Sequence, residues 1–184
     1  SGLWIQHRRI ETMSPRILLC TLALMGLPSL PAKAEIYINP FAGMMVTDTT
    51  ADIGTQRVPD MGGDAPLAGL RLGIQSTGSF LYGAEIEASG MDGRSRLMLN
   101  NGQTYTVNYD YGLGAYVRIG WRTHGQAIGF FRAGMLNTNV DTRLDLGIGA
   151  EVPFSDKVRF RVDLGYAPGD IGFYRLTAGM VIAW

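Results

Sequence analysis

The fold is decided by the stretch Val140-Asp141-Thr142-Arg143-Leu144-Asp145-Leu146-Gly147-Ile148-Gly149-Ala150-Glu151-Val152-Pro153-Phe154, in which two kinds of side chain alternate residue by residue. One set is apolar apart from Thr142, and the other consists of charged residues, glycines and one proline. Because successive side chains of a β-strand point to opposite faces, this period of two predicts a strand with one apolar and one polar face. The same alternation recurs over residues 80–88, 109–122 and 158–166, so the chain is predicted to be all-β.

Turn signals divide the chain into eight expected strands. These cover residues 35–46, 67–76, 79–90, 108–122, 127–136, 140–154, 158–166 and 173–184. The second, fourth and sixth connections are short, whereas the first and third are long, at about residues 47–66 and 91–107. An even number of antiparallel strands, with tight turns on the side of the termini and long loops on the other, predicts an eight-stranded antiparallel up-and-down transmembrane β-barrel. Pro40 lacks a backbone N–H, so the first strand is expected to bulge there or to begin at Phe41.

The region from Met13 to Ala34 has the form of a secretory signal peptide. Arg16 precedes an apolar run over residues 17–27, and Ala32-Lys33-Ala34 supplies a small-residue cleavage site. The apolar run is too short to span a bilayer as a helix. The expected organisation is therefore 1–12 as upstream residues, native or added, 13–34 as signal peptide and 35–184 as the barrel. Cys20 is the only cysteine, so no disulfide is expected after cleavage.

The charged residues of the mature chain are unusual in kind. From Glu35 onward there are 15 acids and 12 bases, a net charge of −3 that argues against nucleic-acid binding. Eleven of the 12 bases are arginine, whereas strand faces in water normally use lysine freely. Arginine alternating with acids suits paired, desolvated hydrogen bonding, so the charged phase is predicted to fill the lumen of the barrel. The expected lumen residues are Arg71, Glu85, Glu87, Asp110, Arg118, Arg132, Arg143, Asp145, Glu151, Arg159, Arg161, Asp163 and Arg175.

Aromatic residues are predicted to form two belts at the membrane interfaces. The belt on the side of the short turns would contain Phe80, Trp121, Phe154 and Trp184, and the belt on the loop side Tyr109, Tyr111, Tyr166 and Tyr174. A soluble barrel whose aromatic side chains pack a core is the alternative explanation of the same residues.

The stretch Thr177-Ala178-Gly179-Met180-Val181-Ile182-Ala183-Trp184 resembles the C-terminal signal by which the insertion machinery recognises outer-membrane barrels. Its characteristic positions are Thr177, Gly179, Ile182 and Trp184. Together with the signal peptide and the eight strands, this pattern makes residues 35–184 similar to the small eight-stranded outer-membrane proteins of the OmpX and OmpA transmembrane-domain type. The resemblance implies the outer membrane of a Gram-negative bacterium, contact with its lipids and lipopolysaccharide, the insertion machinery as a partner during assembly, and no cofactor.

Catalytic chemistry finds little support in the sequence. Small outer-membrane barrels include lipid A deacylases and acyltransferases, which generally use a histidine with a serine and an acid near the outer rim. The histidines here are His7, ahead of the signal peptide, and His124, in a short turn. Glu85 and Glu87 share one strand face, and such a pair of carboxylates could carry out general acid–base catalysis. We favour the simpler interpretation that both accept hydrogen bonds from Arg71 or Arg118.

A metal site is not expected either. The acids Asp48, Asp52, Asp60 and Asp64 of the first loop do not have the spacing of a calcium loop, and no cluster of cysteine and histidine suits a transition metal.

Function is therefore expected in the loops. Leu97-Met98-Leu99 followed by Asn100-Asn101-Gly102 predicts a hairpin that extends the strands outward. Arg94 and Arg96 beside it are candidate contacts for lipopolysaccharide phosphates. The leading hypothesis is a non-enzymatic barrel with a structural or adhesion-like role. The alternatives are a small lipid-modifying enzyme and a narrow channel or ligand carrier.

Overall fold

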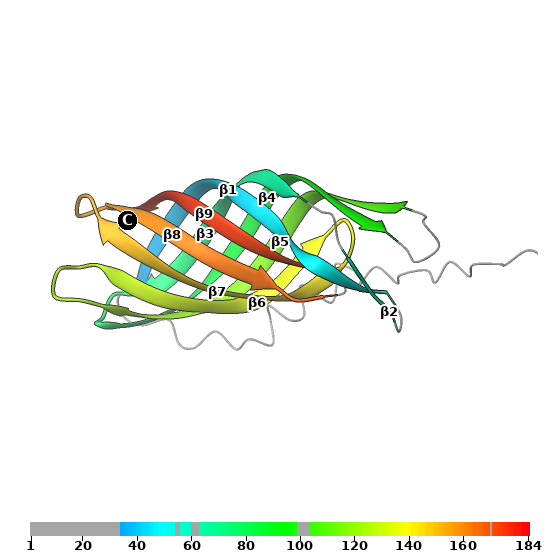
Figure 1. Ribbon diagram of the computed structural model, residues 1–184. Coiled ribbons are helices and arrows are strands. Elements are labelled where there is room, and N and C mark those ends of the chain that lie inside the picture. The colour runs from blue at the N-terminus through cyan, green and yellow to red at the C-terminus, as the bar shows by residue number, and fades with distance from the viewer. Residues whose placement is uncertain (1–33, 54–55, 60–62, 99–103, 170) are drawn as a thin grey trace, which may run out of the picture.

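The computed structural model describes residues 34–184 except 54–55, 60–62, 99–103 and 170, and for 48–53, 56–59, 97–98 and 105 it describes the backbone alone (Figure 1). The expected signal peptide, apart from Ala34, and the upstream residues lie outside this part of the chain. In the described part, no helix is long and apolar enough to cross a membrane.

The described residues form nine strands that pair antiparallel. They are β1 (Ala34–Ile53), β2 (Gln56–Pro59), β3 (Asp64–Ser76), β4 (Phe80–Met98), β5 (Thr104–Arg122), β6 (Ile128–Thr138), β7 (Thr142–Pro153), β8 (Val158–Ala167) and β9 (Ile171–Ala183). Each strand pairs with the next along the ring from β3 to β9, and β1 pairs with both β3 and β9. The result is a closed eight-stranded up-and-down barrel, and β2 only extends the tip of β1. The predicted fold class is confirmed.

The two ends of the barrel differ in their connections. The short turns after β3, β5 and β7 lie at the end where β1 starts and β9 finishes, which we call the turn end (Figure 1). The opposite end, the hairpin end, carries the β1–β2 and β4–β5 hairpins. At the turn end the backbone N–H of Trp184 donates to the Ile36 oxygen at 3.1 Å, so the aromatic residue is held in the ladder between β1 and β9.

The strands at the hairpin end are longer than the sequence predicts. β4 and β5 continue to the pair Met98↔Thr104, which agrees with the predicted extension by a hairpin. β1 continues to Ile53 and folds back as β2, a short strand that the sequence analysis missed. The period of two is weak in this segment, because polar residues occupy both phases, as Thr49 and Thr50 do.

The expectation for Pro40 is wrong in both of its forms. β1 begins at Ala34 and keeps one register with β9 on both sides of the proline, from Ile38↔Ile182 to Phe41↔Gly179. The ladder to β9 lacks pairs at Asn39 and Pro40, while Pro40 still stands opposite Leu70 of β3. The missing N–H therefore leaves a local gap on one side of β1 and does not require a bulge.

The outside of the barrel is apolar and the inside polar along most of each strand. In β8, for example, Phe160, Val162 and Leu164 are exposed, whereas Arg159, Arg161 and Asp163 are buried. This distribution is the reverse of a soluble barrel, which keeps its apolar phase inward. An apolar outer wall around a charged interior is stable only when hydrocarbon surrounds it, so the barrel spans a membrane.

The interior is not polar throughout, which the sequence analysis did not foresee. Near the hairpin end an apolar cluster of Phe41, Met45, Leu67, Phe173 and neighbouring side chains fills the lumen. Smaller apolar groups occupy the turn end, around Tyr37 and around Phe130. Most of the arginines and acids lie between these apolar layers, whereas Arg143 lies against Phe173 at the hairpin end and Arg159 pairs with Glu35 at the turn end.

A register shift near the hairpin end explains two wrong placements. Between Gly90 and Gly93, two residues of β4 stand opposite the single residue Asp110 of β5. At this irregularity Asp110 and Tyr111 are both exposed, while Tyr109 is buried against Phe173 at a ring-centroid distance of 5.4 Å. Asp110 therefore lies outside the lumen, and Tyr109 does not belong to the outer aromatic belt.

The face assignment predicts how the barrel responds to a new charge. Replacing the exposed Val162, in the middle of β8, by arginine should destabilise the barrel by about 2–4 kcal/mol, because the charge enters the hydrocarbon. The measurement is urea unfolding of the protein in phospholipid vesicles. The matched control is Thr106→Arg, an exposed position of the β4–β5 hairpin, which should change stability by less than about 0.5 kcal/mol. Equal costs at both positions would contradict a membrane-embedded wall.

Candidate functional site: the lumen network and the protruding hairpin

Six arginines and six acids of the interior form one continuous set of ion pairs, and we call this set, together with the separate pair Arg143–Asp141, the lumen network. Its ion pairs join seven arginines to seven acids. The arginines are Arg71, Arg118, Arg132, Arg143, Arg159, Arg161 and Arg175, and the acids are Glu35, Glu85, Glu87, Asp141, Asp145, Glu151 and Asp163. The formal charges of this set cancel, as buried charges require.

Glu87 of β4 lies at the centre of the network. Its carboxylate accepts from Arg71 at 2.8 Å, from Arg132 at 3.2 Å and from Arg175 at 2.5 Å. These three arginines come from β3, β6 and β9, so one carboxylate links opposite walls of the barrel. Arg71 also reaches Asp163 at 3.0 Å, and its third nitrogen donates to the Thr177 hydroxyl at 3.1 Å.

A second group of contacts lies toward the turn end. Arg161 binds Glu85, which also accepts from the Tyr37 hydroxyl at 2.5 Å. Arg118 reaches Glu151 at 2.6 Å, and Arg159 joins Glu151 at 2.7 Å. Glu85 accepts from two residues, and Glu151 lies within ion-pair distance of two arginines, which offsets part of the cost of removing each carboxylate from water.

Inward aromatic rings stack on several of these arginines. The guanidinium carbon of Arg118 lies 3.8 Å from the ring centroid of Phe130, and that of Arg71 lies 3.9 Å from the centroid of Phe41. A guanidinium can stack on an aromatic face while its edge donates hydrogen bonds. The rings therefore join the charged layer to the apolar layers above and below it.

Glycine provides the space that the large side chains need. A Cβ on Gly147 would lie 2.8 Å from the Arg132 side chain, and one on Gly73 would lie 2.2 Å from the ring of Tyr37. These positions belong to the inward phase of β7 and β3. The alternation of glycine with charge in the sequence thus reflects the packing of long side chains in a narrow lumen.

The structure brings together twelve of the thirteen residues that the sequence placed in the lumen, and Asp110 is the exception. Several members of the site were missed: Glu35, Asn39, Asp141 and the tyrosines Tyr37 and Tyr116. The tyrosines were missed because only charged residues were assigned to the lumen. The alternation could have found Tyr116, which follows the same phase as Gly114 and Arg118.

The candidate catalytic groups are bound within this network or lie far from the hairpins. Glu85 and Glu87 are both buried, and Glu87 accepts from Arg71 as the simpler interpretation proposed, whereas Glu85 accepts from Arg161, with Arg118 3.8 Å away. His124 lies in the β5–β6 turn at the turn end. Among the described residues, no group of three or more histidines, cysteines or acids is placed to hold a metal ion. The side chains of Asp48, Asp52 and Asp60 lie outside the described residues.

Comparisons with known proteins rest on structure alone, since no family model and no curated protein matches the chain. OprG, an outer-membrane protein of Pseudomonas aeruginosa, is similar with a TM-score of 0.56 at 10% identity, covering 83% of this chain and 96% of OprG. The attachment invasion locus protein Ail of Yersinia pestis gives 0.49 at 9% identity, covering 82% and 98%. Neisserial surface protein A gives 0.44 at 12% identity, also covering 82% and 98%.

The likeness to OprG shows the fold, and the apolar wall shows the environment. This protein has the fold of the small outer-membrane β-barrels. In such barrels the short turns face the periplasm and the long loops face the cell exterior, so the hairpin end of this barrel is the outer end.

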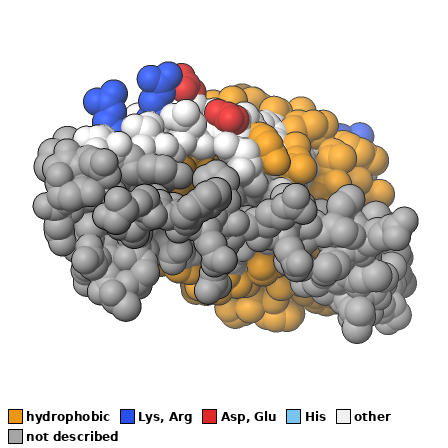
Figure 2. Space-filling model, turned by 90° about the vertical axis from the view of Figure 1, so that its right-hand side faces the viewer, with side chains coloured by type: hydrophobic (Ala, Val, Ile, Leu, Met, Phe, Trp, Pro, Cys, Tyr) orange, Lys and Arg blue, Asp and Glu red, His pale blue; other side chains and the backbone are white. Residues whose placement is uncertain are grey.

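The outer end of the barrel carries exposed charge. Arg94 and Arg96 lie on the outward face of the β4 extension, opposite Asn108 and Thr106 of β5. Figure 2 looks onto this end and shows basic and acidic side chains gathered at the rim, beside the hydrophobic side chains of the wall.

The residues of the predicted C-terminal insertion signal lie on both faces of β9. Thr177 is buried and its hydroxyl accepts from Arg71, whereas Ile182 and Trp184 are exposed on the outside.

The network predicts a large difference between two substitutions of the same kind. Glu87→Gln should destabilise the barrel by about 3–5 kcal/mol, because three buried arginines lose their shared counter-charge. Asp110→Asn, at the exposed position, should change stability by less than about 0.5 kcal/mol. Both are measured by urea unfolding in vesicles of one lipid composition. If Glu87→Gln reduced the free energy of unfolding as little as Asp110→Asn does, the lumen ion pairs would not be tightly coupled.

Proposed function

We propose that this protein is a non-enzymatic outer-membrane barrel that interacts with other molecules at the cell surface through its protruding hairpins. The observation that carries the proposal is the free length of β4 and β5. Pairing of β3 with β4 ends at Leu67↔Met91, and pairing of β5 with β6 ends at Gly112↔Thr138. Beyond these pairs β4 and β5 continue together to Met98↔Thr104, as a two-stranded hairpin above the wall.

The β5 side of this hairpin has an open edge. Asn139, in the β6–β7 turn, covers the first part of it, accepting from the Asp110 N–H at 2.9 Å and donating to the Asn108 oxygen at 2.9 Å. These are the two bonds that a neighbouring strand would make. From Val107 to Thr104, no other described strand pairs with this edge. An unpaired strand edge is a template for pairing with a partner chain.

The filled interior favours this role over transport. Apart from Asp141 and Glu35, the side chains of the lumen network and of the apolar cluster near the hairpin end are buried, and eight strands leave only enough room for side chains. Arg94 and Arg96 support a second contact, with the phosphates of surrounding lipopolysaccharide, because arginine binds phosphate with two hydrogen bonds.

The proposal is tested by shortening the hairpin. Bacteria of a non-adherent strain that produce this protein should attach to epithelial monolayers at least about threefold more than bacteria in which residues 95–107 are replaced by Asn-Gly. The two variants must insert equally, which a heat-modifiable band on unboiled gels establishes. The replacement leaves the barrel wall below the last β3–β4 and β5–β6 pairs unchanged. A loss of attachment would therefore be due to the missing hairpin. Equal attachment would remove the proposed role.

The alternative functions give different signals in the same strains. A change in lipid A mass on production of the barrel would indicate a lipid-modifying enzyme. Stable single-channel openings of the purified protein in planar bilayers would indicate a channel. Channel openings are not expected from a barrel with a neutralised, filled lumen, and a change in lipid A mass is not expected because His124 lies at the turn end.

We further propose that Thr177, Gly179, Ile182 and Trp184 are recognised by the barrel insertion machinery. Trp184→Asp should reduce the amount of heat-modifiable barrel in the outer membrane severalfold, because a charge replaces the exposed aromatic ring. Trp184→Phe retains an aromatic side chain and should insert normally. If the two variants assemble equally well, the pattern has no role in recognition.

A further inference from the structure

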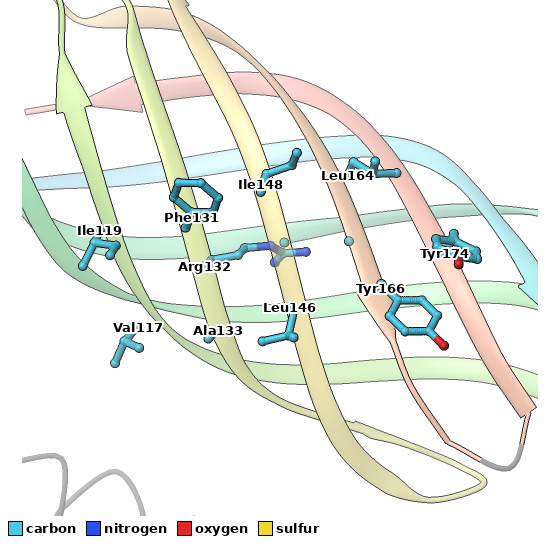
Figure 3. A pocket seen from close by; sticks show the side chains of 12 residues that line it. Val117, Ile119, Phe131, Arg132, Ala133, Leu146, Ile148, Leu164, Tyr166 and Tyr174 are labelled. Atoms are coloured by element: carbon cyan, nitrogen blue, oxygen red, sulfur yellow. The ribbon is translucent and has the colours of Figure 1, made fainter.

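A groove of about 480 Å³ crosses the outer wall of the barrel from β5 to β9 (Figure 3). One bank is a row of directly opposed residues on successive strands, Val117, Ala133, Leu146, Tyr166 and Tyr174. The other bank is the next outward row, which includes Ile119, Phe131, Ile148 and Leu164. The groove therefore runs across the strands, between two apolar rows.

No side chain points outward from the floor of the groove. Between the two rows lie Arg132, Gly147 and Gly165, whose side-chain positions face the lumen, and Gly147 and Gly165 stand opposite each other. Ala133 is the only small side chain among the outward-pointing residues that line the groove. A larger side chain at this position would fill the groove without entering the lumen.

The groove spans one leaflet of the membrane. At one end, Tyr166 is one residue from the outer end of β8, and Tyr174 is near the start of β9. At the other end, Val117 lies five residues before the inner end of β5, and a tilted membrane strand crosses in about 9–11 residues. The groove thus descends from the outer interface to about the middle of the bilayer.

The outer end of the groove also carries hydrogen-bonding groups. The rings of Tyr166 and Tyr174 stack with their centroids 4.6 Å apart, and they lie side by side in Figure 3. Within the described residues, neither hydroxyl forms a hydrogen bond. A long apolar channel that ends at two paired phenol groups matches an acyl chain followed by its ester or amide carbonyl.

We propose that this groove seats one acyl chain of lipid A, the lipid anchor of lipopolysaccharide, with the linkage to the sugar at Tyr166 and Tyr174. Three properties favour this occupant. The wall around the groove lies in hydrocarbon, the groove is one leaflet long, and that leaflet is the outer one, which in outer membranes holds lipopolysaccharide. The volume is also within the range of ordered ligand sites, about 300–1,000 Å³. The site is separate from the β4–β5 hairpin.

The test is retention of added lipid by the folded full-length barrel in native mass spectrometry. The probes are hexa-acylated lipid A and dioleoylphosphatidylglycerol, each supplied at the same ratio in detergent. The wild-type barrel should retain one lipid A, whereas Ala133→Phe should retain it about tenfold less because the ring occupies the groove. Ala133→Leu is a milder second variant, which should weaken retention in the same direction.

The matched control is Ala88→Phe, which adds the same ring to the exposed face of β4, outside the groove. This variant should retain lipid A as the wild type does, and Tyr174→Phe should retain less because one hydroxyl is lost. Equal retention by the wild type and both Ala133 variants would overturn the site. Retention of the phospholipid as strongly as lipid A would overturn the assignment of the occupant.

Discussion

Pairing between buried arginine and carboxylate side chains is the interaction on which the rest of this barrel depends. Hydrocarbon surrounds the wall, so the polar phase of every strand must turn inward. Inside, a charge without a partner destabilises a protein by several kcal/mol. The seven arginines and seven acids meet this constraint by cancelling one another, and each of the eight barrel strands contributes at least one of them. The network therefore ties together walls that the backbone ladder joins only to their neighbours.

Filling the lumen in this way shifts function to the outside of the barrel. Glu87 holds arginines from three different strands, so the middle of the barrel leaves little freedom for rearrangement. The surfaces that remain for recognition are the open edge of β5 above the membrane and the grooved apolar wall within it. These two surfaces use different chemistry, namely backbone hydrogen bonding in water and shape matching in hydrocarbon.

The sequence analysis succeeded where one phase of a strand was clearly apolar and the other clearly charged. In β8, arginines and Asp163 alternate with Phe160, Val162 and Leu164, and the structure turns them to the expected faces. It failed where both phases were apolar. The inward Phe41, Met45 and Leu67 form a cluster near the hairpin end, because alternation alone cannot say which apolar phase faces the lumen.

Local irregularity caused the other errors. Tyr109 was assigned to the outer belt and Asp110 to the lumen by extending the period of two through a register shift. No residue pattern in the sequence indicates this shift. β2 was missed because its segment carries no clear alternation, and the gap in the ladder at Pro40 depends on which neighbour its missing N–H would have faced.

The sequence by itself determined the strands, their apolar and polar faces, and the excess of arginine that requires a paired interior. These properties follow from the geometry of a single strand, in which adjacent side chains point in opposite directions. The partners were decided only by the tertiary structure. Arg71 binds Asp163 across 92 positions of sequence and Thr177 across 106. Contacts over such separations exist only after the ring has closed, because closure sets both the stagger of the strands and the distance across the lumen.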